Sequence, residues 1–60
     1  MTLRTFLNSV KEEQNVLIKA DWSAAGFYRY GTVSDIAYIF LGREVLSVSA
    51  KNDELIIEVN

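Results

Sequence analysis

The spacing of apolar residues predicts a helix at the start of the chain and a strand after it. The apolar positions in residues 2–14 recur at helical spacing and share one face of a helix. Thr2 precedes them and is suited to cap the first turn, because its hydroxyl can accept a free backbone N–H. In residues 15–21 the period changes to two, which is typical of a strand with one buried face. The helical positions are Leu3, Phe6, Leu7 and Val10, and the strand positions are Val16, Ile18 and Ala20.

Residues 22–33 are predicted to continue this strand as a hairpin. The stretch "WSAAG" has small residues and a glycine, which suit the connection between two strands. The stretch "FYRYGTV" is rich in residues that favour strands. Alternation would place Phe27, Arg29 and Gly31 on one face, with Tyr28, Tyr30 and Thr32 on the other.

The unbroken apolar run 36–41 does not distinguish a helix from a buried strand by its period. We predict a short helix, because Ser34 or Asp35 can cap its start and Gly42 suits the left-handed residue that ends a helix. In that helix the residues turned inward are Ile36, Ile39 and Phe40, and those partly outside are Tyr38 and Leu41.

Residues 43–60 are predicted to form a second hairpin, with "KNDE" as its turn. The core side would carry Leu46, Val48, Ala50, Leu55, Ile57 and Val59, and the wet side would include Val45 and Ile56. The order α-β-β-α-β-β predicts one α+β domain over residues 1–60. Its two layers would be two helices and a four-stranded, mainly antiparallel sheet.

The amino-acid composition argues against disulfides, metal sites and catalysis. The chain has no cysteine and no histidine, so disulfides, ordinary zinc sites and the usual proton shuttle are missing. Asp21 and Asp35 are candidates for acid–base work, but ending a strand and capping a helix explain them better. Ser47 and Ser49 have no base to activate them. We therefore predict neither an enzyme nor a cofactor or metal site.

The charge of the chain and the length of its apolar stretches bear on its partners and on its location in the cell. Six basic and eight acidic residues give a net charge of −2, and the basic residues are scattered, which disfavours nucleic-acid binding. No apolar stretch approaches the ~20 residues that cross a bilayer, and the first residues lack a secretory signal pattern. These features predict a cytoplasmic protein without a membrane partner.

The stretch "ADWSAAGFYRYGTV" predicts a protein-binding surface. It holds four of the seven aromatic residues (three Phe, three Tyr, one Trp), and the other apolar residues already nearly fill so small an interior. Trp, Tyr and Arg are the residues enriched at interface hot spots. The predicted partner-binding residues are Trp22, Phe27, Tyr28, Arg29 and Tyr30.

Other readings of the aromatic stretch stay open. Phe27 and one tyrosine could belong to the core, and the rings could stack single-stranded nucleic acid in an accessory protein. A small scaffold without staples often recruits a second copy, so a homodimer is predicted, with Tyr38 and Leu41 as its self-association patch.

Two stretches, "TLRTFLNSV" and "YGTVSDIAYIFLGREVLSVSAKNDELIIEV", resemble small uncharacterised proteins of Firmicutes phages, integrated prophages and other mobile elements. The most distinctive part is "REVLSVSA…ELIIEV". The resemblance implies a compact acidic protein that binds a host protein, such as a component of antiviral defence, and inhibits it by occlusion. It implies no catalytic residue.

Overall fold

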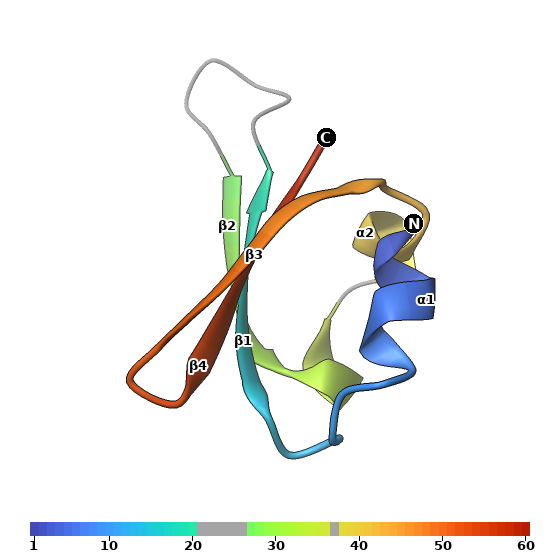
Figure 1. Ribbon diagram of the computed structural model, residues 1–60. Coiled ribbons are helices and arrows are strands. Elements are labelled where there is room, and N and C mark those ends of the chain that lie inside the picture. Colours follow the sequence, from blue (N-terminus) through green and yellow to red (C-terminus); the bar gives the residue numbers. More distant parts are fainter. Residues whose placement is uncertain (21–26, 37) are drawn as a thin grey trace.

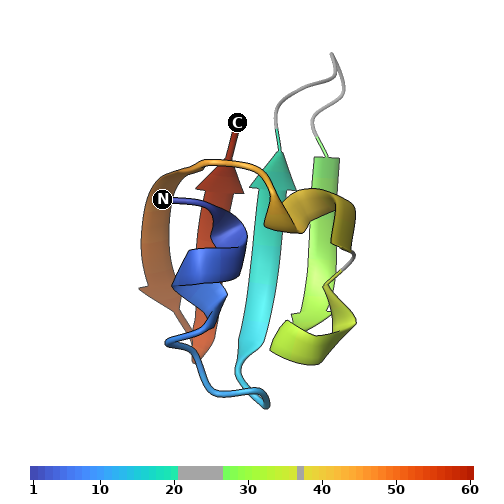
Figure 2. The ribbon, with the colours of Figure 1, turned by 90° about the vertical axis from the view of Figure 1, so that its right-hand side faces the viewer.

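Two short helices lie on one face of a mixed β-sheet (Figures 1 and 2). The computed structural model describes residues 1–20, 27–36 and 38–60, with residues 27–30 described through their backbone pairing. The elements in chain order are α1 (Leu3–Leu7), β1 (Asn15–Ala20), β2 (Phe27–Thr32), the 3₁₀ helix η1 (Val33–Asp35), α2 (Tyr38–Leu41), β3 (Val45–Lys51) and β4 (Glu54–Val59). The α+β class was predicted, and the observed order differs from the predicted one by the insertion of η1.

Within the described residues the four strands are ordered β2-β1-β4-β3. Both hairpins are antiparallel, but β1 and β4 meet in the centre of the sheet as a parallel pair. The prediction of a mainly antiparallel sheet is therefore corrected to a mixed one. The connection from β1 to β4 passes through β2, η1, α2 and β3, and a long connection of this kind lets two strands run in the same direction.

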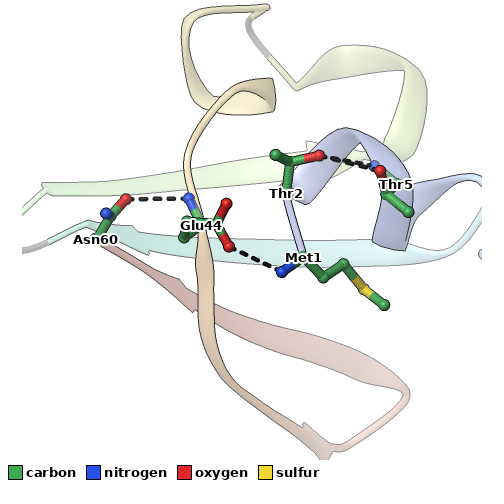
Figure 3. A network of polar contacts seen from close by, with 5 residues as sticks. All are labelled: Met1, Thr2, Thr5, Glu44 and Asn60. Carbon is green, nitrogen blue, oxygen red and sulfur yellow. Dashed lines mark hydrogen bonds and ion pairs between the residues drawn. The ribbon is translucent and has the colours of Figure 1, made fainter.

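The first helix is capped as predicted but is shorter than predicted. Thr2 Oγ1 accepts a hydrogen bond from the Thr5 N–H at 3.3 Å, as Figure 3 shows. The helix ends at Leu7 rather than continuing to residue 14. Asn8 and Ser9 follow it, and short polar side chains compete with the helical backbone for hydrogen bonds. The turn after them still lets Val10 pack against the core.

The apolar run 36–41 is divided between an extended residue and a single helical turn. Ile36 and Phe40 are buried and Tyr38 is 80% exposed, as predicted. Ile39 was predicted to face inward, but it is 53% exposed, because one helical turn directs only Phe40 to the sheet. Leu41 is half-buried against the core.

The predicted caps of this segment are also different. Asp35 accepts hydrogen bonds from the N–H and the Oγ1 of Thr32, at 3.2 and 3.0 Å, and so belongs to η1 rather than to α2. Gly42 does not adopt the left-handed conformation expected of it.

The central strands bury most of the predicted residues, with Leu55 of β4 half-buried against the core, and β3 does not. All the predicted positions of β1 are fully buried, as are Ile57 and Val59 of β4. On β3 a bulge lies between Val45 and Ser47. Val45, predicted on the wet side, pairs with Val59 and packs against the core. The three residues of β3 that were predicted to be buried but are exposed are Leu46, Val48 and Ala50.

The turn between β3 and β4 is confirmed at Lys51–Glu54. Its central residues Asn52 and Asp53 have φ angles of 52° and 63°. Positive φ at both central positions defines a type I′ turn, the type whose twist matches that of a hairpin.

Both described ends of the chain are joined to the segment before β3 (Figure 3). The amino group of Met1 forms an ion pair with Glu44 Oε2 at 2.8 Å, and Val45 N–H donates to the Met1 carbonyl at 2.9 Å. Glu44 N–H donates to Asn60 Oδ1 at 3.0 Å, and Asn60 N–H donates to the Glu44 carbonyl at 3.1 Å. These contacts fix where β3 begins against the rest of the sheet.

Candidate interaction surface

The backbone register arranges the strands into rows that cross the sheet. No helix of the described residues lies over one of its two faces (Figure 1), and we call this the open face. Residues directly paired across strands share a face. In the order β2, β1, β4 and β3, the open-face rows are Tyr30–Leu17–Ile56–Ser49, Tyr28–Lys19–Glu58–Ser47 and Thr32–Asn15–Glu54–Lys51.

The open face has a small apolar centre between two polar rows. Leu17 is only 9% exposed and Ile56 is half-buried, although Leu17 does not belong to the core cluster beneath the helices. Lys19 and Glu58 are paired in register, and Ser47 Oγ donates to Glu58 Oε1 at 3.3 Å. With Lys51 and Glu54, the described charged residues of this face balance to zero.

The predicted partner-binding residues are divided by the structure. Trp22 lies outside the described residues. Tyr28 and Tyr30 take register positions on the open face, in rows with Lys19 and Leu17. The other two predicted residues, Phe27 and Arg29, pair with Ala20 and Ile18, which are buried on the helical side. The alternation of a strand therefore separates residues that the sequence grouped together.

The predicted self-association residues also differ from each other. Tyr38 is exposed, whereas Leu41 packs partly against the core. The exposed apolar neighbour of Tyr38 is instead Ile39. We call Tyr38 and Ile39 the α2 patch.

Sequence reasoning missed the outer strand of the second hairpin as a surface. Leu46 is 61% exposed and Val48 is 42% exposed. Their alternation resembles that of a buried strand, and only the strand order shows that β3 lies at the margin of the sheet.

A groove of about 250 Å³ lies on the helical side. Its volume is below the ~300–1,000 Å³ typical of small-molecule sites. Its lining residues are Arg4, Leu7, Asn8, Val33, Ser34, Ile36 and Leu41.

Among the carboxylates and hydroxyls weighed for chemistry, Asp35 and Ser47 have structural partners. Asp35 holds Thr32, and Ser47 holds Glu58; Asp21 lies outside the described residues. In the described part of the chain, no three His, Cys, Asp or Glu side chains are grouped to hold a metal ion. No helix there is long and apolar enough to cross a membrane. Comparison with known family models, curated proteins and solved structures finds no significant match.

Proposed function

We propose that this chain is a small cytoplasmic protein-binding module that docks on its partner through the β2 side of the open face. The supporting observation is the row Tyr30–Leu17–Ile56, in which an aromatic register position continues an apolar centre across the sheet. Binding surfaces of proteins combine an apolar or aromatic centre with a polar rim. Tyr28 and Tyr30 are the proposed anchors, and Lys19 and Glu58 belong to the rim.

The shape and charge of this face favour a protein as the ligand. A sheet face over which no described helix lies suits an extended contact, and the charge balance of the described residues gives no strong attraction for phosphate groups. A typical interface covers about 800 Å² on each partner. The molecule has an accessible surface of 4081 Å², so one such contact would take about a fifth of it and leave other surfaces free.

Occlusion is the mechanism we propose. A protein of 6.8 kDa that covers a functional surface of a larger protein blocks access to it without any chemistry. The resemblance to proteins of phages and mobile elements adds a host protein, such as a defence component, as the proposed target.

The test replaces the two anchors and compares them with the α2 patch. A photo-crosslinking residue at position 30 would first identify the partner by mass spectrometry in a bacterial lysate. With the purified partner, calorimetry should show that Tyr28→Ala with Tyr30→Ala weakens binding about tenfold or more, as loss of hot-spot residues does. The matched variant Tyr38→Ala with Ile39→Ala, on the helical side, should bind normally.

Circular dichroism decides how a loss of binding is interpreted. If the double tyrosine variant binds poorly and keeps the native spectrum, the anchors are supported. If the variant unfolds, the tyrosines are core residues and the proposed surface is wrong. Equal loss in the α2 variant would also contradict the proposal.

Stacking of nucleic acid is the second candidate, because Tyr28 pairs in register with Lys19 on the open face. Aromatic rings beside a cation are typical of single-strand binding. Titration with single-stranded and duplex oligonucleotides at two salt concentrations separates the candidates. Binding that weakens steeply with salt supports nucleic acid, and no binding at low salt rejects it.

A further inference from the structure

At the start of β3 the Val45 N–H donates to the Met1 carbonyl, but beyond Val45 no described strand pairs with the outer edge of β3. β3 is the last strand in the sheet order and pairs only with β4 among the described strands. Figure 2 shows it at the margin of the sheet opposite β2. Natural edges are often protected by charges, prolines or bulges. Here the bulge precedes Ser47 and the one charge is Lys51, so the segment between them has none of these.

We propose that residues 47–51, which we call the β3 edge, pair antiparallel with the same segment of a second copy. The two-fold axis lies at Ser49, so that Ser49 faces Ser49, Val48 faces Ala50 and Ser47 faces Lys51 of the second copy. The two sheets become one continuous sheet. This dimer forms at the margin of the sheet opposite β2 and does not depend on the proposed anchors Tyr28 and Tyr30, although Glu58 belongs to the rim of the partner site and also to the dimer contact.

The backbone groups of the β3 edge are in phase with this register. Lys51 and Glu54 close the type I′ turn as a pair whose N–H and C=O groups point toward each other. Alternation then directs the N–H and C=O groups of Val48 and Ala50 away from β4. In the proposed register these two residues face each other across the dimer axis, so all their outward groups find partners.

The side chains of the two copies also match by face. On the helical side the apolar pair Ile57–Val48 meets Ala50–Leu55 of the second copy. On the open face Ile56–Ser49 meets the identical pair. An odd shift of the register would bring apolar residues opposite polar ones, because a shift of one residue exchanges the faces of a strand.

Charge complementarity is the feature that selects a second copy as the occupant. The hydrogen bond from Ser47 holds the Glu58 carboxylate toward the β3 edge. In the proposed register Lys51 of the second copy faces Ser47, beside this carboxylate. The two-fold axis repeats the contact, so each copy offers one cation and one carboxylate. No like charges face each other within the paired segment.

The contact is small, so the dimer should be weak. A single strand pairing buries less than the ~1,200–2,000 Å² of stable interfaces. The expected behaviour is a reversible monomer–dimer equilibrium over micromolar to millimolar concentrations, measured by sedimentation velocity. A monomer at every concentration would overturn the proposal.

Cysteine pairs test the register, since the chain has no cysteine of its own. Opposed antiparallel residues have Cα atoms ~4.5–5.5 Å apart, within the range of a disulfide. Ser49→Cys should therefore give a disulfide-linked dimer on mild oxidation. Ser47→Cys and Lys51→Cys should each stay monomeric. In the proposed register the two copies of either residue are offset by four positions along the strands, which separates them by about 13 Å. Their equimolar mixture should crosslink. Ser34→Cys, on an exposed residue that follows β2 at the opposite margin of the sheet, measures random collision.

The outcomes are decisive in each case. Crosslinking of Ser49→Cys and of the mixture, above the Ser34→Cys level, supports the proposal. Crosslinking of Ser49→Cys no greater than that of Ser34→Cys overturns it, and self-crosslinking of Val48→Cys alone overturns the register.

A charge at the dimer axis provides an independent test. Ser49→Lys should raise the dimer dissociation constant by about tenfold or more, because two like charges would face each other. Ser49→Thr, which keeps the hydroxyl and favours strands, should leave it unchanged. Both residues are accommodated at an exposed position, so the monomer spectrum should not change. Equal dimerisation by Ser49→Lys and Ser49→Thr would contradict the proposal, whatever the outcome for the partner site.

Discussion

Ile57 and Val48 face each other across β4 and β3, yet one is fully buried and the other is 42% exposed. Both lie on the helical side of the sheet. Ile57 is on a central strand beneath the helices, whereas Val48 is on the marginal strand beside them (Figure 2). Alternation determines which residues share a face. Whether that face is covered depends on the order of strands in the sheet.

The largest expected effect on stability is that of Ile57→Ala, and Val48→Ala on the facing strand is its control. Ile57→Ala removes buried methyl groups and should lower the free energy of unfolding by about 2–5 kcal/mol. A domain of sixty residues is stable by only about 3–9 kcal/mol, at ~0.05–0.15 kcal/mol per residue, so this variant should lose a large part of the free energy of unfolding of the domain. Val48→Ala should cost less than about 1 kcal/mol, because Val48 is already partly in water.

Urea denaturation at a concentration low enough to keep the protein monomeric measures both values. Equal losses of stability from Ile57→Ala and Val48→Ala would show that β3 is covered as fully as β4. The difference in burial between the two residues would then be wrong.

The parts of the fold that were predicted correctly depend on residues that are close together in the chain. The N-cap at Thr2, the turn at Lys51–Glu54 and the buried alternation of β1 each involve a few consecutive positions. The parallel pairing of β1 with β4 joins residues almost forty positions apart, such as Asn15 and Glu54. No local pattern contains that information, and the burial of β3 depends on it.

The candidate site was predictable only in part, for the same reason. Alternation correctly separated Tyr28 and Tyr30 from Phe27 and Arg29 in the strand register. Grouping all four as one surface was an argument from composition, which does not respect the two faces of a strand. The exposure of Ile39 required knowing that α2 has a single turn.

The two glycines Gly31, near the end of β2, and Gly42 also differ in their surroundings. Gly31 has a φ of +155°, and a Cβ there would lie 2.8 Å from the Cβ of Asp35. Gly31→Ala should therefore destabilise the protein by about 1–3 kcal/mol through backbone strain and displacement of η1. Gly42→Ala is the control, because a Cβ there meets nothing within 4 Å.

Thermal unfolding measures both glycine variants. The control should be neutral or slightly more stable, since alanine reduces the freedom of the unfolded chain. A Gly31→Ala variant as stable as Gly42→Ala would show that β2 and η1 do not meet as closely as the structure has them.

The smallest expected effect lies in the turn that fixes the register of β3. Asp53 has a φ of 63°, and glycine adopts that conformation more readily than aspartate. Asp53→Gly creates the Asn-Gly pair favoured in type I′ turns and should stabilise the protein by about 0.5 kcal/mol. Asp53→Ala should have the opposite effect, because the left-handed region costs alanine about 1 kcal/mol. If both substitutions had the same sign in urea denaturation, the turn would not be type I′. Since this turn sets Val48 opposite Ile57, the exposure of β3 would then need another explanation.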